Sequence, residues 1–104
     1  MLKIENYTDG KGNPAGGIVE CVGLTVKWQD GPLGAPPGEP NGAQVEELLE
    51  ACISRLLFYQ TAAGGRFGCN ENLDAIGNIQ AALEHLKART RNRVERRVEG
   101  TNTP

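Results

Sequence analysis

The sequence lacks any apolar run near the ~18 residues that a membrane-spanning helix needs. Its first ten residues, MLKIENYTDG, have neither the basic start nor the apolar stretch of a secretory signal, so we expect the protein to stay in the cytoplasm. Apolar residues make up only 38% of the 104 residues, and glycine and proline are concentrated in the first 42. A chain of this length buries only about 65% of its unfolded surface, so we expect oligomerisation to stabilise it.

Groups suited to catalysis or metal binding are also scarce. Cys21, Cys52 and Cys69 form no close pair, which argues against a disulfide framework and against zinc. We expect reduced thiols, with Cys52 in the core. His85 is the single histidine, and no Ser-His-Asp order, G-x-S-x-G or paired carboxylates accompany it. The stretch GKGNPAGG lacks the G-K-[ST] ending of a phosphate-binding loop. We therefore expect no catalytic residue, no metal and no cofactor.

The N-terminal part of the sequence predicts β structure. Residues 2–7 alternate loosely between apolar and polar, and residues 17–31 are rich in β-branched and aromatic side chains. The second segment is either one long strand or two strands that break at Gly23. Residues 31–42, GPLGAPPGEPNG, cannot be helical and are typical of a linker.

Two apolar stripes then predict a helical hairpin. Asn41 can cap the first helix, with Gln44 three residues on as in a capping box. The stretch TAAGGRFG at 61–68 ends that helix and turns the chain. The second helix starts near 70–72 and is longer by about two turns, so its end has no partner in the same hairpin. The stripes are formed by Val45, Leu48, Leu49, Cys52, Ile53, Leu56 and Leu57, and by Leu73, Ile76, Ile79, Leu83 and Leu86.

The expected fold is of the α+β class, with an N-terminal antiparallel β segment followed by a long antiparallel helical hairpin. We expect a β-rich segment with its linker at 1–40, the hairpin at 41–97 and a C-terminal tail at 98–104. Together these parts would form one compact domain.

Positive charge is concentrated at the end of the second helix. The segment 87–97 holds six basic residues and one acid, although the whole chain has a net charge of −2. The apolar stripe, extended at the same spacing, passes through Thr90, Arg93 and Arg97. Arg89 precedes Arg93 by four residues, so these arginines share a face and can converge on one ligand. Guanidinium groups suit bidentate phosphate binding. An acidic protein with one such segment suits a small anion better than a long nucleic acid. The alternative is a solvated helix end.

Five other residues could contact a nucleotide. Phe67 lies in a glycine-flanked loop, where it could stack on a base or plug the end of the hairpin. Asn70 and Asn72 lie at the expected helix start, where they could cap the helix or bind the polar edges and phosphate of a nucleotide. Lys27 and Trp28 could contribute from the β segment, although a tryptophan is more often a core residue.

Three stretches of the sequence resemble a family of phage proteins. NGAQVEELLEACISRLLFYQ, RFGCNENLDAIGNIQAALEHLKARTRNR and RRVEGTNTP are similar to the helical hairpin of phage anti-defence nucleotide sponges. That hairpin is shared by anti-CBASS sponges and by the first-described type of Thoeris anti-defence protein. The Thoeris type has a β-rich segment before the hairpin, as this chain has in residues 1–34. The turn R-F-x-C-x-E-N, the step R-T-x-x-R and the tail V-E-G-T carry the resemblance together.

The resemblance implies a viral protein of the host cytoplasm that binds cyclic nucleotide immune signals and holds them without cleavage. It implies a homo-oligomer, a hexamer built from dimers, with no nucleic acid polymer and no membrane as partner. The implied ligand is glyco-cyclic ADP-ribose, and some relatives also take cyclic oligonucleotides at separate sites. Such a protein would block Thoeris or CBASS signalling.

The resemblance also implies roles for particular residues. Arg89 and Arg93 match positions that would neutralise the diphosphate of a cyclic ADP-ribose. Asn72 would bond ribose or base edges, Phe67 would stack, and the β segment would close over the ligand through Lys27 or Trp28. The tail VEGTNTP departs from the pattern in having asparagine where we expect many relatives to have histidine, which leaves the role of that position open.

Three other functions fit parts of the sequence. An enzyme that cleaves the signal could use the arginines with Glu71, but no metal cluster or activated base supports it. A small Arg-rich nucleic-acid-binding protein would bind DNA with an affinity that falls steeply with salt. A structural oligomer, in which the arginines pair with Glu47 or Glu50 of a neighbour, would bind no ligand at all.

Overall fold

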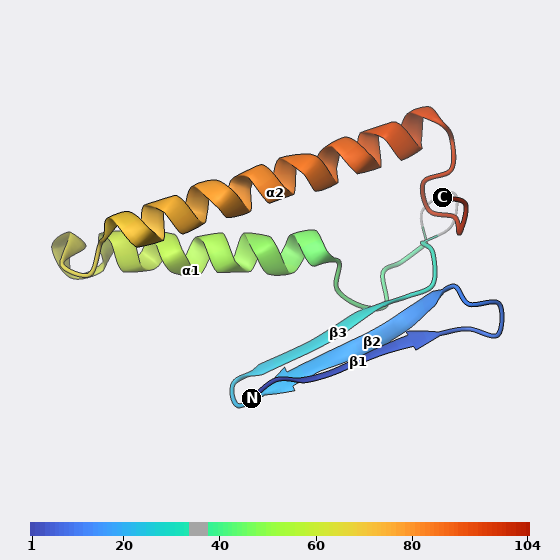
Figure 1. Ribbon diagram of the computed structural model, residues 1–104, viewed down its shortest axis with the longest axis horizontal. Coiled ribbons are helices and arrows are strands. Elements are labelled where there is room, and N and C mark those ends of the chain that lie inside the picture. The colour runs from blue at the N-terminus through green and yellow to red at the C-terminus, as the bar shows by residue number, and fades with distance from the viewer. Residues whose placement is uncertain (34–37) are drawn as a thin grey trace. The chain divides into compact units, whose positions relative to one another are not determined.

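The computed structural model describes residues 1–33 and 38–104 (Figure 1). The antiparallel strands precede the two long helices, which confirms the predicted α+β class. Residues 34–37 of the expected linker lie outside the described residues. None of the described helices is long and apolar enough to cross a membrane. The elements are β1 (Lys3–Thr8), β2 (Pro14–Cys21), β3 (Leu24–Asp30), α1 (Val45–Gly65) and α2 (Asn70–Glu95).

The chain divides into two compact units. The sheet unit combines Met1–Val45 with Arg93–Pro104, and the helical unit comprises Glu46–Asn92. The last turn of α2 and the residues after it therefore belong to the sheet unit, whereas the rest of α2 belongs to the helical unit.

In the sheet unit, the three strands form one antiparallel sheet in the order β1-β2-β3. The chain turns between β2 and β3 at Gly23, whose φ of 82° favours glycine, so of the two alternatives the structure has two strands that break at this residue. Val19 of β2 lies between Ile4 of β1 and Val26 of β3, and Val26 is buried. Residues directly opposite one another share a face of a sheet, so these three form its apolar face.

The residues that follow the linker extend the sheet before α1 begins. Ala43 forms a parallel bridge with Trp28. The carboxamide of Asn41 accepts a hydrogen bond from the N–H of Asp30 at 2.8 Å and donates one to its carbonyl oxygen at 3.0 Å. The prediction that Asn41 caps the first helix is therefore wrong. Its side chain forms hydrogen bonds with the backbone of Asp30 at the end of β3, and α1 starts at Val45.

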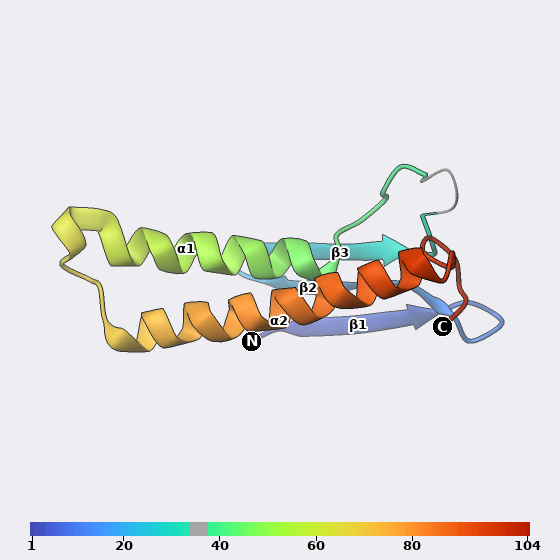
Figure 2. The same ribbon diagram turned by 90° about the horizontal axis from the view of Figure 1, so that it is seen from above.

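In the helical unit, α1 and α2 run antiparallel as a hairpin, as both views show (Figures 1 and 2). Ile76 and Leu83 of α2 are buried, but α1 has no buried residue. Leu57 and Leu73 lie on the predicted stripes and are 46% and 53% exposed. Cys52 is also exposed, so the prediction of a core position for it is wrong. One hairpin gives each helix a single neighbour, which covers only part of each stripe.

The turn between the helices is formed as the sequence predicts. Helical geometry ends before Ala62, whose ψ is 149°, and Ala63 and Gly64 then have φ values of 52° and 68°. The carboxamide of Gln60 holds the far end of the turn. It accepts a hydrogen bond from the N–H of Cys69 at 2.9 Å and donates one to the carbonyl oxygen of the same residue at 3.2 Å. This clamp fixes where α2 begins.

The turn between β1 and β2 depends on one carboxylate. Asp9 accepts hydrogen bonds from the backbone N–H groups of Asn13, at 3.0 Å, and Lys11, at 2.8 Å. These bonds stabilise the ionised form, so the pKa of Asp9 lies below its ordinary value, with the Asn13 bond as the largest cause.

We expect Asp9→Ala to lower the thermal stability at neutral pH, because it removes both bonds. A carboxyl whose pKa is lowered by folding stabilises the fold above its unfolded pKa, and this contribution is lost as the pH falls below about 4. Thermal unfolding of wild type and variant at about pH 7 and about pH 2 should therefore show a difference that shrinks in acid. Lys11→Ala is the control, since it keeps the backbone donor. An equal difference at both pH values would contradict this account.

Candidate functional site

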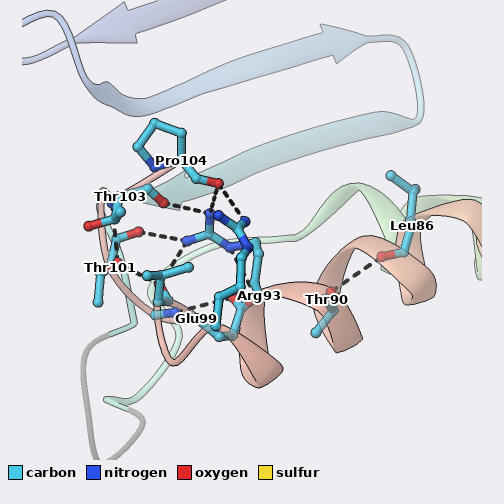
Figure 3. A network of polar contacts seen from close by, with 10 residues as sticks. Leu86, Thr90, Arg93, Glu99, Thr101, Thr103 and Pro104 are labelled. Atoms are coloured by element: carbon cyan, nitrogen blue, oxygen red, sulfur yellow. Dashed lines mark hydrogen bonds and ion pairs between the residues drawn. The ribbon is translucent and has the colours of Figure 1, made fainter.

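Arg89, in the arginine segment on the last turns of α2, has an unpaired guanidinium. Arg89 is exposed, and nothing in the described part of the chain forms a hydrogen bond or ion pair with it. Thr90, the next residue, is half-buried, and its hydroxyl donates to the carbonyl oxygen of Leu86 at 3.3 Å (Figure 3). Arg89 therefore has donors for an external anion, whereas Thr90 has its donor engaged within the helix.

Arg93 is held by the C-terminal tail, residues 98–104 (Figure 3). Its Nε–H donates to Oε2 of Glu99 at 3.2 Å, which is also an ion pair. The four other bonds of the guanidinium end on main-chain oxygens of Thr103 at 2.6 Å, Pro104 at 3.2 Å, Val98 at 2.9 Å and Thr101 at 3.1 Å. A guanidinium has five N–H donors, so the tail provides an acceptor for each. The side chain of Arg93 is only 17% exposed.

Arg97 does not share the face of Arg93, because α2 ends before it. Its φ of 57° is left-handed. The N–H of Arg97 donates to the carbonyl of Val94, and the N–H of Val98 donates to the carbonyl of Arg93, both at 3.0 Å. These two bonds form the Schellman motif that terminates many helices. The predicted four-residue series of arginines therefore stops at Arg93, and the placement of Arg97 on that face is wrong.

The predicted nucleotide contacts near the turn of the hairpin lie in the helical unit. Phe67 is 57% exposed, and the guanidinium carbon of Arg66 lies 5.0 Å from the centre of its ring. The ring does not plug this hairpin, and its exposed surface is free for stacking. Asn70 is the first residue of α2, and Asn72 is half-buried in the first turn. Phe67, Asn70 and Asn72 are called the turn group below.

The turn group is far from the arginines within one chain. α2 is continuous from Asn70 to Glu95. At about 1.5 Å per residue, Arg89 lies about 26 Å from Asn72 along the helix axis. One small ligand cannot contact both residues of the same chain. The predicted site residues therefore fall into the turn group and an arginine group, which consists of Arg89, Thr90 and Arg93.

Lys27 and Trp28 of β3 point to opposite faces of the sheet. In the register of the strands, Lys27 lies opposite Ile18 and Trp28 lies opposite Gly17. Trp28 is half-buried and lines an open hollow of about 360 Å³ together with Asn6 and other residues of the sheet unit. Only one of the two predicted β-segment contacts can therefore reach a given ligand, and Trp28 is the one with a hollow beside it.

Two residues that support these groups were not found from the sequence. Glu99 neutralises Arg93, and Gln60 fixes the turn that carries Phe67. Glu99 is one of two acids beside five arginines, the other being Glu95, so the sequence alone does not single it out, and a glutamine in a helix carries no signal. Among residues 1–33 and 38–104, no three histidine, cysteine or acidic side chains are grouped closely enough to hold a metal ion.

Comparison with known proteins identifies one informative relative. No family model matches the chain. A protein of Bacillus phage SBSphiJ7, "Thoeris anti-defense 1", is 38% identical over 78 residues. The match covers 75% of this chain and 51% of the relative, so the chain spans about half the length of the protein that it matches. The resemblance drawn from the sequence motifs is confirmed, and the similarity places this chain in the Thoeris anti-defence family.

Proposed function

We propose that this Thoeris anti-defence protein sequesters a cyclic nucleotide immune signal in the host cytoplasm and does not cleave it. The ligand would be a cyclic ADP-ribose isomer such as glyco-cyclic ADP-ribose, with cyclic oligonucleotides as a second class. The observation that supports this most directly is the exposed, unpartnered guanidinium of Arg89, in the one basic segment of an acidic chain. A diphosphate is the part of such a ligand that a guanidinium binds best.

Sequestration requires affinity instead of turnover. Depleting a nanomolar signal requires a dissociation constant of about a nanomolar, or roughly −12 kcal/mol. Charge-assisted hydrogen bonds contribute about 1.5–3 kcal/mol each, and stacking contributes about 1–3 kcal/mol per base. Two arginines, a carboxamide and an aromatic ring reach this range at the upper end of these contributions, before the costs of association. Arg89 and Arg93 would hold the diphosphate, Asn72 the ribose or base edge, and Phe67 the base.

The site proposed here is shared between two copies of the chain. The turn group and the arginine group are separated by about 26 Å in one chain, so a ligand that contacts both needs each group from a different copy. A second hairpin would also cover apolar side chains that one hairpin leaves exposed, among them Leu57 and Leu73. A symmetric dimer of this kind contains two equivalent sites, and dimers of dimers or trimers of dimers, up to the expected hexamer, preserve both.

A filtration experiment tests sequestration against cleavage. Protein in excess is mixed with glyco-cyclic ADP-ribose, unbound ligand is removed through a filter, and the retained protein is denatured by heat. We expect intact ligand in the denatured fraction and none in the first filtrate. Recovery of a degraded product would identify an enzyme, and ligand left in the first filtrate would contradict binding of this class.

The arginine contact is tested by a matched pair of variants. Arg89→Ala should weaken binding of glyco-cyclic ADP-ribose by about 10- to 150-fold, the equivalent of one charge-assisted bond of ~1.5–3 kcal/mol. Arg91→Ala removes the same charge from the other side of α2 and should change the affinity little. Calorimetric titration measures both. Equal losses would indicate a diffuse electrostatic attraction, as a nucleic-acid-binding protein would show, and no loss in either variant would remove the arginine contact.

A mixing experiment tests whether two copies form the site. Asn72→Ala and Arg89→Ala each remove one half of every site in a symmetric dimer, so neither variant alone should bind tightly. When both are expressed together, one site of each mixed dimer keeps both residues, and random mixing restores about a quarter of the sites. The stoichiometry of tight binding in the mixed sample is the measurement. A site formed within one chain predicts no restoration.

A further inference from the structure

The tail already satisfies the arginine that the proposed function assigns to the diphosphate. Every N–H of the Arg93 guanidinium has an acceptor in the tail, and the side chain is 17% exposed. In this conformation Arg93 has no donor left for a ligand. A phosphate group can contact it only if part of the tail moves away.

We propose that the tail is an internal competitor for Arg93, so that a closed state with the tail bound and an open state with the ligand bound exclude one another. This inference rests on the proposed function. Three of the acceptors in the closed state are neutral carbonyl oxygens, those of Val98, Thr101 and Thr103, and another is the carboxylate of Glu99. Phosphate oxygens form stronger, charge-assisted bonds with a guanidinium than neutral oxygens do, so a diphosphate can displace them. Glu99 is the side-chain acceptor, and its charge has the same sign as that of the ligand.

Several other hydrogen bonds of the tail lie within the tail itself, where the hydroxyl of Thr101 donates to the carbonyl of Val98 and the N–H of Gly100 donates to the carboxylate of Glu99. Within the tail, the N–H of Thr101 donates to the carbonyl of Val98 at 3.1 Å, and the N–H of Thr103 donates to the hydroxyl of Thr101 at 3.2 Å. Arg96 adds a bond to the main-chain oxygen of Pro104 at 2.8 Å. Arg93 is thus the main anchor of the tail. If a ligand took the donors of Arg93, the tail would lose most of the contacts that order it. A segment held by so few contacts has low local stability and can open without unfolding the rest of the protein.

Competition of this kind has a measurable consequence for affinity. The apparent dissociation constant equals the intrinsic constant divided by the fraction of molecules in the open state. A change that weakens the closed state without touching Arg93 should therefore tighten ligand binding. Glu99→Gln is such a change, because it keeps the size of the side chain and removes the charge that pairs with Nε.

The test compares two full-length variants with the same change in net charge. Calorimetric titration with glyco-cyclic ADP-ribose should show about 3- to 10-fold tighter binding for Glu99→Gln than for wild type, through a larger open fraction. Glu95→Gln removes an exposed acid from the last residue of α2 and should change the affinity less than about twofold, since exposed charges contribute weakly. Equal changes in both variants, or weaker binding by Glu99→Gln, would overturn the competition.

A second measurement follows the tail itself. In nitrogen-15 NMR spectra of the full chain, the Nε–H signal of Arg93 and the amide signals of Thr101 and Thr103 should shift when glyco-cyclic ADP-ribose is added. Ligand binding without any change in these signals would overturn the competition and leave the proposed function intact. Absence of binding by wild type would overturn the proposed function and the competition together.

Discussion

A two-helix hairpin offers each of its helices one neighbour, and this constraint determines most of what the helical unit can do. Ile76 and Leu83 of α2 are buried, while α1 buries no residue and Leu57 and Leu73 remain about half exposed. Burial of apolar surface is the main favourable contribution to folding, so a hairpin of this composition gains from a further surface. The length of α2 leaves its end without a partner helix in the same hairpin. It also separates Asn72 from Arg89. Under the proposed function, stability and ligand binding place the same demand on the molecule, which is a second copy.

The sequence predicted those structural features that depend on a few neighbouring residues. The break at Gly23 and the end of α1 at TAAGGRFG follow from residues that adopt positive φ or interrupt an apolar pattern, and both are observed. Two predictions failed where a side chain or backbone group had a competing partner. Asn41 has the right chemistry for a helix cap, but the open end of β3 uses its carboxamide. Arg97 has the right spacing for a helical face, but a Schellman motif ends the helix before it.

In the arginine group, too, the residue type is known from the sequence but the hydrogen-bond partners are not. The sequence indicates which residues are arginines and which share a helical face, but it does not indicate which donors are already used. Arg89 and Arg93 look equivalent in the pattern R-T-x-x-R, yet one is exposed and the other has all its donors engaged. The partners of Arg93 are mostly main-chain oxygens, and any sequence presents those. Only the path of the tail, which turns at Gly100 with a φ of 79°, determines where they lie.

Under the proposed function Arg93 belongs to an anion site, and such a site has a physical reason to engage its arginines when no ligand is bound. Guanidinium groups that converge on one ligand repel one another, and a charged group at 17% exposure loses much of its hydration. A partly buried charge needs a hydrogen-bonded partner in every state of the protein. The tail meets this need with one carboxylate, which cancels the charge, and four main-chain oxygens, which satisfy the remaining donors. Because those acceptors are mostly neutral, a diphosphate improves on them, whereas water alone does not. In the proposed competition, the tail thus keeps Arg93 ready for an anion without leaving it unpaired in the free protein.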